Sequence, residues 1–288
     1  PMMISRPVHL LASRRSYAHA VHRLRRLAGV LTVLTVLVAV GSRSSGPAWL
    51  RTGTTHAAAG DLDATFGTGG KQIVPPPAGA TGAVSFVLGV GPDGRIWQVS
   101  RVGLADGEYH IGVVIYDPDD GAPLAVPGPD SPWLLPDVPG GSSTIGAIAF
   151  QPDGKVVLAG GFMPTGAPGS VHLIVRLTAA GALDTAPGTG FGTTGFVKAT
   201  MPVGAMGSDA RGVAIQGDKV IVAGIMSTTP SGQQIFVARY NANGTLDGGF
   251  GSGGYQLIGT AAHEEATDVT VLPDNRIVVS GSGDRGGQ

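Results

Sequence analysis

The sequence predicts an all-β protein: a β-propeller, or an open propeller arc, of about four four-stranded antiparallel blades, preceded by an N-terminal signal helix. Three observations lead to this fold class. A repeat of about sixty residues fills residues 61–288, each copy contains four short strand candidates, and the 288 residues include 48 glycines and 21 prolines. Long uninterrupted helices are incompatible with that much glycine and proline.

The composition excludes several classes of protein. Charged residues make up 14% of the chain, against roughly 25% in an ordinary soluble domain, which excludes a coiled coil and a polyelectrolyte tail. The chain has no cysteine, so disulfide scaffolds, thiolate zinc sites and thiol nucleophiles are excluded together. The hydrophobic share of 42% is enough for a core in one large or two smaller domains.

The charges divide the chain near residue 60. Eight of the nineteen basic residues and no acidic residue precede Asp61, whereas the rest of the chain has eleven basic and twenty acidic residues, a formal charge of −9. A negative mature region argues against nucleic acid and anionic membrane surfaces as partners, and we expect no membrane insertion of the mature chain. The break therefore separates an N-terminal segment, 1–59, from the repeat region, 60–288.

Residues 1–59 are predicted to be an export signal. Arg25 and Arg26 precede a run of fourteen uncharged residues, 27–40, and small residues follow it, which is the order of regions in a secretory signal peptide. As a helix, such a run covers about 21 Å, less than the roughly 30 Å of a membrane core, so a transmembrane helix is the weaker alternative. We expect a secreted or cell-surface protein.

The cleavage site and the export route remain open. Cleavage after Ala59 follows three consecutive alanines, and cleavage after Ala48 is the alternative with a shorter spacer. The pair Arg14 and Arg15 is similar to part of a twin-arginine signal, which leaves that route open beside general secretion.

The first repeated element is a tight turn between two strand candidates. It occurs as GPDGRIWQVS (91–100), QPDGKVVLAG (151–160), QGDKVIVAGI (216–225) and LPDNRIVVSG (272–281). Its aspartates are 60, 65 and 56 residues apart and are Asp93, Asp153, Asp218 and Asp274. Because a short Asp-Gly turn uses the carboxylate to accept nearby backbone N–H groups, we assign these residues a structural role rather than a cation site.

The second repeated element is a glycine-rich corner. It occurs as DLDATFGTGG (61–70), ALDTAPGTGFGTTG (182–195) and TLDGGFGSGG (245–254), with Asp63, Asp184 and Asp247. A degenerate copy is expected near Leu124, where the aspartate and the FG pair are lost. Four copies therefore cover approximately 61–124, 125–183, 184–246 and 247–288.

Each copy predicts four antiparallel strands. The runs TDVTVLP and RIVVSGS flank Asp274 and Asn275 as a hairpin, and IFVARY leads through a corner into YQLIG. Such small sheets cannot bury both faces alone, so the copies must stack. A period near sixty residues favours radial stacking as a propeller, and a linear β-solenoid, which has a shorter period, is the alternative.

The repeat resembles a known family. The alternation of a PDGK-type hairpin with the pattern of FVARYNANGTLDGGFGSGG (236–254) is similar to the delta-60 repeat of secreted bacterial proteins. The resemblance covers essentially all of residues 61–288 and implies a propeller-like fold. It implies an architecture and no particular reaction.

The spacing of two charged residues predicts an ion pair within a blade. Arg176 precedes Asp184 by eight residues, and Arg239 precedes Asp247 by the same number. The degenerate copy has Ile115 and Pro123 at these positions and has therefore lost both partners together. We predict that each arginine binds the aspartate of its own corner.

No residue is assigned a catalytic, cofactor-binding or metal-binding role. The loop from Asp117 to Gly121 is similar to a calcium loop but is one residue short and lacks the distal glutamate, so a turn is favoured. The run from His263 to Glu265 has no second histidine four positions later, which favours a solvated loop. His110 and His172 do not indicate a three-ligand metal site.

Three functional hypotheses remain. The first is a secreted or cell-surface binding and scaffolding propeller with an unknown extracellular glycan or protein as partner; the proline-rich segment 122–140 with Trp133 fits it. The second is a purely structural array in a larger surface protein. The third is a hydrolase or lyase acting on polysaccharide, which needs two converging carboxylates; Glu108, Glu264 and Glu265 are the only glutamates. No cofactor is expected.

The two ends of the repeat region are complementary. The corner at 61–70 lacks the strand that leads into the other corners, and the last copy stops before its arginine-bearing strand. We therefore expect the natural gene to continue past Gln288 with further copies, and the chain to form an open arc in which residues 61–74 do not pair with 276–282.

Overall fold

The computed structural model of the chain describes residues 35–38, 61–229, 232–259 and 263–284. All regular structure in these residues is β-strand, so the predicted all-β class is confirmed. None of the described residues lies in a helix, and accordingly no helix that could span a membrane is found among them.

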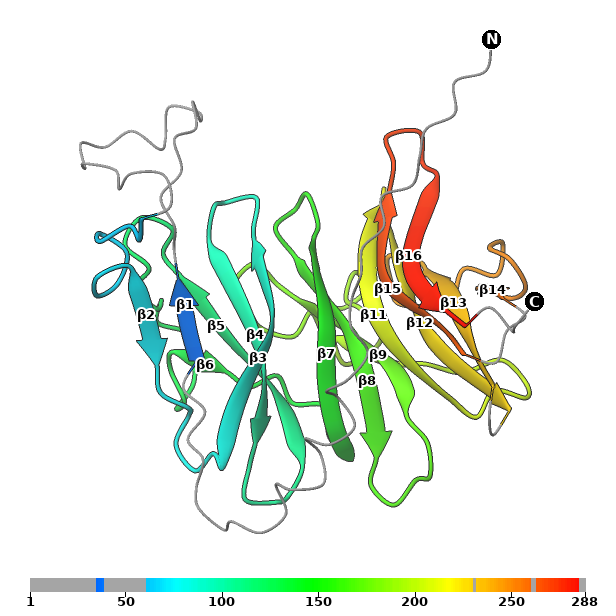
Figure 1. The fold of residues 1–288 in the computed structure, drawn as a ribbon, viewed down its shortest axis with the longest axis horizontal. Helices are drawn as coiled ribbons and strands as arrows, with labels where there is room; N and C mark the ends of the chain where they lie inside the picture. Colours follow the sequence, from blue (N-terminus) through cyan, green and yellow to red (C-terminus); the bar gives the residue numbers. More distant parts are fainter. Residues whose placement is uncertain (1–34, 39–60, 230–231, 260–262, 285–288) are drawn as a thin grey trace. The chain divides into compact units, whose positions relative to one another are not determined.

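The strands form consecutive antiparallel sheets, here called blades 1 to 4 (Figure 1). Within each blade the strands keep the order of the sequence, as in a propeller. Blade 1 contains β3 (Gly82–Val90), β4 (Ile96–Gly103), β5 (Tyr109–Tyr116) and β6 (Trp133–Leu134). Blade 2 contains β7 (Gly141–Phe150), β8 (Val156–Pro164), β9 (Val171–Leu177) and β10 (Phe196–Lys198). Blade 3 contains β11 (Gly207–Gln216), β12 (Lys219–Thr229), β13 (Gly232–Tyr240) and β14 (Tyr255–Ile258). Blade 4 has two described strands, β15 (Glu264–Val271) and β16 (Ile277–Gly283).

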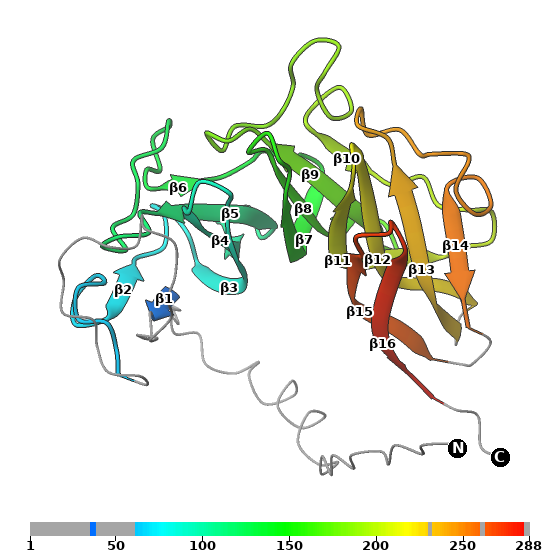
Figure 2. The same cartoon turned by 90° about the horizontal axis from the view of Figure 1, so that it is seen from above.

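The blades pack against one another in chain order. The first strand of each blade contacts three strands of the preceding blade: β7 contacts β3, β4 and β5, β11 contacts β7, β8 and β9, and β15 contacts β11, β12 and β13 (Figure 2). Apolar clusters fill these junctions, around Trp97 and Leu173 between blades 1 and 2 and around Ile174 and Phe236 between blades 2 and 3. Burial of these side chains is the main force that holds the blades together.

The central strands are buried on both faces. In β8, the seven residues from Val156 to Phe162 are all buried. A strand with a neighbouring blade on each side has no solvated face, so its sequence is a continuous apolar run without the alternation of a half-exposed strand. The runs VVLAGGF and VIVAGIM owe their composition to this position.

The sequence repeat and the blade are offset by one strand. Residues 125–183, for example, contain β6 of blade 1 and the first three strands of blade 2, and 184–246 contain β10 and the first three strands of blade 3. Each copy therefore supplies the outer strand of one blade and most of the next. The chain continuity between them adds a covalent link at every junction.

Every first strand has a β-bulge in the same place. The register shifts between Ser85 and Val87 in β3, and equivalent shifts occur in β7, β11 and β15. The extra residues are all exposed and differ in chemistry: Phe86, Gly146, Arg211 and Thr267. A bulge bends its strand and re-aims a side chain, so the fold repeats while the exposed side chain varies.

One part of the predicted signal helix is a strand. Thr35–Val38, within the apolar run 27–40, forms β1 and pairs antiparallel with β2 (Lys71–Val74). Thr and Val are β-branched and favour extended backbone over helix, which accounts for the difference at these four residues. The rest of residues 1–59, with both cleavage sites and the arginines, lies outside the described residues.

The two ends of the repeat region do not pair with each other. Among the described residues β2 pairs with β1 and β16 pairs with β15, and no ladder joins residues 61–74 to 276–282. Residues 285–288 lie outside the described part of the chain.

Candidate functional site

The blades have two edges of different character. The first, called the turn rim, carries the β3–β4, β7–β8, β11–β12 and β15–β16 hairpins together with the corners 61–70, 182–195 and 245–254. The second, called the loop rim, carries the β4–β5 and β8–β9 connections and the starts of β3, β7, β11 and β15. The turn rim repeats the same contacts from blade to blade, and the loop rim does not.

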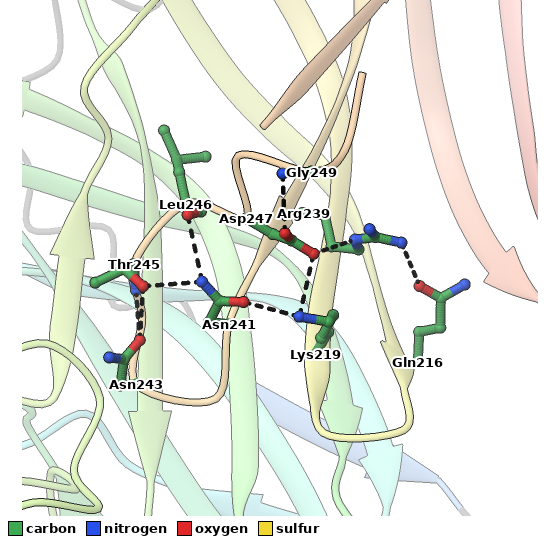
Figure 3. A network of polar contacts seen from close by, with 9 residues as sticks. All are labelled: Gln216, Lys219, Arg239, Asn241, Asn243, Thr245, Leu246, Asp247 and Gly249. Atoms are coloured by element: carbon green, nitrogen blue, oxygen red, sulfur yellow. Dashed lines mark hydrogen bonds and ion pairs between the residues drawn. The ribbon is translucent and has the colours of Figure 1, made fainter. Parts of the chain in front are cut away.

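The corner of blade 3 shows the repeated contact of the turn rim (Figure 3). Oδ2 of Asp247 accepts hydrogen bonds from Nε of Arg239 at 2.8 Å and from Nζ of Lys219 at 3.1 Å, and Oδ1 accepts the backbone N–H of Gly249 at 3.1 Å. The hydrogen bond from Lys219, followed by those from Gly249 and Arg239, holds the pKa of Asp247 below its usual value. The carboxylate of Asp247 therefore links the β11–β12 hairpin, strand β13 and the corner 245–254.

Blade 2 contains the same arrangement in buried form. Nε of Arg176 lies 2.6 Å from Oδ2 of Asp184, and Nζ of Lys155 lies 3.3 Å from the same oxygen. The two partners of the shorter pair are 3% and 2% exposed. Arg176 also stacks over the ring of Phe191 at 4.9 Å. The predicted pairs of arginine and aspartate are thus both present.

The lysines of these networks were missed from the sequence, although a signal was there. Lys155 lies two residues after the turn aspartate Asp153, and Lys219 directly follows Asp218, in the two copies that keep the corner arginine. The other two copies have an arginine at this place, and it pairs with its own turn aspartate: Arg95 with Asp93 at 3.5 Å and Arg276 with Asp274 at 2.7 Å. A lysine therefore occupies this position in the two copies where it contacts a corner aspartate, Asp184 or Asp247.

Three of the four turn aspartates bind backbone as expected from a short turn. Oδ1 of Asp93, Asp153 and Asp274 accepts the N–H of the residue two positions later at 3.1, 3.1 and 3.2 Å. Asp218 accepts no hydrogen bond from the described residues, because its turn is one residue shorter and Gly217, at φ 62°, makes the reversal. In the first corner, Asp63 accepts the N–H of Thr65 at 3.0 Å.

In blades 1 to 3, a glycine that follows the third strand lies against a large side chain from the chain segment that precedes the blade. A Cβ on Gly121 would lie 2.6 Å from the Phe66 ring, and one on Gly244 would lie 3.4 Å from Phe191. In the degenerate copy a Cβ on Gly181 would lie 2.1 Å from Leu134. Leu134 therefore takes the place of the lost FG phenylalanine, which the sequence alone did not reveal because it lies ten residues beyond Leu124.

The loop similar to a calcium site is a turn that binds its own backbone. Oδ1 of Asp117 accepts the N–H of Asp119, Oδ1 of Asp120 accepts that of Ala122, both at 2.8 Å, and Gly121 has φ 70°. The carbonyl of Asp120 accepts the N–H of Gly67 at 2.6 Å. The loop thus contacts the first corner, 61–70.

The loop rim has an open cleft between blades 2 and 3. Its volume is about 440 Å³. Met163 and Met206 are half exposed beside it. Polar groups from three segments complete its wall: Ser170, Ser208, Asp209, Arg211 and Gln233. Exposed apolar side chains around a few polar groups are typical of ligand sites.

Asp209 is the unusual group of this cleft. Its carboxylate accepts no hydrogen bond from any described residue, although it lies in β11 close enough to Gly161 that a Cβ there would be 2.9 Å from Oδ1. Burial raises the pKa of Asp209 above its ordinary value, and the positive charge of Arg211 opposes the rise. A partly buried carboxylate without a donor that faces an open cleft is a candidate for ligand recognition.

Two further cavities lie in the described residues. One, of about 310 Å³, is lined by His263, Glu264 and Glu265 but not by Glu108, so the structure brings together only two of the three glutamates considered for hydrolysis. The other, of about 340 Å³, lies in the proline-rich segment. Trp133 is 2% exposed there and donates Nε1–H to the carbonyl of Pro75 at 2.7 Å, so its indole is structural rather than a free binding surface.

The two histidines of the blades have different surroundings. His172 is fully buried at the junction of blades 2 and 3, with Nδ1 2.8 Å from the hydroxyl of Ser208 and Nε2 2.7 Å from that of Tyr240. Burial lowers the pKa of His172 to about 3. His110 lies half buried on the loop rim, where Asp106 and Glu108 converge with it. Sequence reasoning missed this second group.

Comparison with known families supports the architecture. The model of a β-propeller domain of unknown function, DUF5122, matches residues 151–186 and 216–250. Both matched segments begin at a turn-rim hairpin and end in the following corner, so they are equivalent parts of two consecutive copies. No curated protein matches the chain. The matched part of the chain is thus similar to a propeller domain for which neither a ligand nor an activity is indicated.

Proposed function

We propose that this chain is an exported binding or scaffolding propeller that holds its ligand in the loop-rim cleft between blades 2 and 3. The unpartnered carboxylate of Asp209 in that cleft carries the proposal. A ligand with hydrogen-bond donors, such as the hydroxyl groups of an extracellular glycan or the donors of a protein side chain, would satisfy it. Met163 and Met206 would supply apolar contact.

The contrast between the two rims supports this choice of site. On the turn rim, the polar groups of Arg176, Asp184, Arg239 and Asp247 are all engaged with one another or with backbone. Groups that already have partners offer little to a ligand, since each new bond must replace an existing one. On the loop rim, the side chains at the equivalent positions of the blades differ and leave open space.

The proposal also includes export of the chain from the cell and its membership of the delta-60 repeat family. The charge break at residue 60 and the apolar run 27–40 support export. The repeat of hairpin and corner, and the match of two copies to a propeller model, support the resemblance.

A glycan array and a pull-down from extracellular material test the binding function. The chain is applied as exported, beside the variants Asp209→Asn and Asp119→Asn. Asp119 is an exposed aspartate of the β5–β6 connection, outside the cleft, so its substitution controls for the loss of one negative charge. We expect the parent chain to retain a ligand. The affinity for it should fall at least tenfold in Asp209→Asn and should not change in Asp119→Asn. Equal binding by both variants would place the ligand elsewhere.

A purely structural array is the second candidate, and one observation favours it. Two corners bind the following blade through backbone hydrogen bonds: Gly67 donates to the carbonyl of Asp120 at 2.6 Å, and Gly192 donates to the carbonyl of Asn243 at 2.8 Å. If neither screen retains any ligand with the intact chain, this function is the better one.

A further inference from the structure

The β4–β5 connection of blade 1 brings three metal-ligating side chains to one place on the loop rim. Asp106 lies in the turn of this connection, where Gly107 has φ 81°, and Glu108 and His110 are alternate residues at the entry to β5. Their ligand atoms all lie within 4.8 Å of one another. In the described part of the chain, no other group of three histidine, aspartate or glutamate side chains converges in this way.

Two of the three ligands are held in position. Oδ1 of Asp106 accepts the backbone N–H of Glu108 at 2.9 Å, and its Oδ2 lies 2.8 Å from Nε2 of His110. Oε1 of Glu108 accepts a hydrogen bond from the hydroxyl of Thr165, which belongs to the β8–β9 connection of blade 2. Hydrogen bonds of this kind orient metal ligands and raise affinity. The group thus spans the junction of two blades.

We propose that Asp106, Glu108 and His110 bind a divalent transition-metal ion of the zinc class. One imidazole and two carboxylates are a set of three protein ligands typical of zinc, with a fourth position left for water or a donor atom of another molecule. Calcium prefers six to eight oxygen ligands and magnesium an octahedron rich in water, so neither makes use of the imidazole. This inference does not depend on the proposed function.

The geometry needs little change to accept the ion. Tetrahedral zinc with bonds of about 2.0–2.2 Å places its ligand atoms about 3.3–3.6 Å apart. Oδ2 of Asp106 and Nε2 of His110 are 2.8 Å apart, so they need to separate by about 0.5–0.8 Å.

Isothermal titration of the full chain with zinc chloride at pH 7.5 tests the site. The variants are His110→Ala, Glu108→Gln and a triple variant that combines these two substitutions with Asp106→Asn. The matched control is His263→Ala, because His263 lies on the same rim but is not part of a converging group of three ligands. Near-ultraviolet circular dichroism and thermal unfolding in the presence of a chelator establish that each variant folds.

We expect one zinc ion per chain to be lost in the triple variant and a loss of at least about 100-fold in affinity in His110→Ala, because a direct ligand is worth more than an orienting residue. Thr165→Val is expected to weaken binding about tenfold. His263→Ala should bind as the parent chain does.

Two results would overturn the site. The first is a zinc titration of the triple variant that equals that of the parent chain. The second is calcium binding as tight as zinc binding and unaffected by His110→Ala, which would mean a purely carboxylate cation site.

Discussion

Arg176 of blade 2 donates a hydrogen bond from Nη1 to the backbone carbonyl of Ala242 in blade 3, at 2.5 Å. The same guanidinium binds the carboxylate of Asp184 and, through Nη2, the carbonyl of Thr189 at 2.7 Å. One buried cation therefore fixes its own corner and the distance to the next blade. The corresponding Arg239 of blade 3 is 22% exposed and bonds to Gln216 within its own blade.

Because of this difference, we expect substitution by alanine to lower the free energy of unfolding more at Arg176 than at Arg239. Arg176→Ala leaves Asp184 buried beside only Lys155 and should lower the free energy of unfolding by about 3–5 kcal/mol. Arg239→Ala removes a partly solvated partner and should cost about 1–2 kcal/mol. Urea unfolding of both variants measures this. Equal losses would mean that the contact between blades adds nothing.

The glycines that receive corner side chains predict a second stability effect. Gly181→Ala places a Cβ 2.1 Å from Leu134 at φ 88°, whereas Gly188→Ala, at φ 78°, meets nothing within 4 Å. Both variants carry the strain of a left-handed backbone, about 1–2 kcal/mol, and only Gly181→Ala adds the clash. We expect Gly181→Ala to be the less stable by at least about 1 kcal/mol.

A double-mutant cycle identifies the source of that difference. Leu134→Ala creates space for the new methyl group, so the loss in the double variant should be smaller than the summed losses of the single variants. Additive losses would contradict a direct contact between residues 134 and 181.

His172 predicts a loss of stability in acid. Its pKa is about 3 in the folded chain and about 6.5 in the unfolded chain, so below pH 6.5 the unfolded state binds the extra proton. The free energy of unfolding is therefore not reduced by His172 above pH 6.5. It decreases as the pH falls toward 3, by about 2 kcal/mol between pH 6.5 and pH 5. Unfolding curves across this range measure the slope.

The variant His172→Gln serves as the control for this slope. It keeps polar atoms beside Ser208 and Tyr240 but does not titrate. Its stability is expected to be lower overall and to change less between pH 6.5 and pH 5. An unchanged slope would assign the acid effect to other groups.

The apolar run 27–40 predicts export with removal of residues before Asp61. Leu34→Arg places a charge in the centre of the run and should retain the chain inside the cell, because a secretory signal requires an uninterrupted apolar region. Ser45→Arg, outside the run, should still be exported. Cell fractionation and N-terminal sequencing of exported material measure both. An exported chain that keeps Thr35–Val38 would leave β1 paired with β2 and would make the run an element of the fold.

The sequence alone determined the period, the all-β class and the ion pairs, because these depend on short-range patterns. The spacing of eight residues between Arg176 and Asp184 spans one strand end and one corner, so local chain geometry brings the two side chains together. The tight turns at Asp93 and Asp274 follow in the same way from neighbouring residues.

The contacts between blades could be decided only by the tertiary structure. Leu134 replaces an aromatic residue against Gly181, Asp209 remains without a donor, and Glu108 meets Thr165 of the next blade. Leu134 and Gly181 belong to different blades, as do Glu108 and Thr165, and their approach depends on how the sheets pack rather than on sequence spacing. Long-range packing selects side chains by shape and by available space, and neither property is visible in a linear pattern.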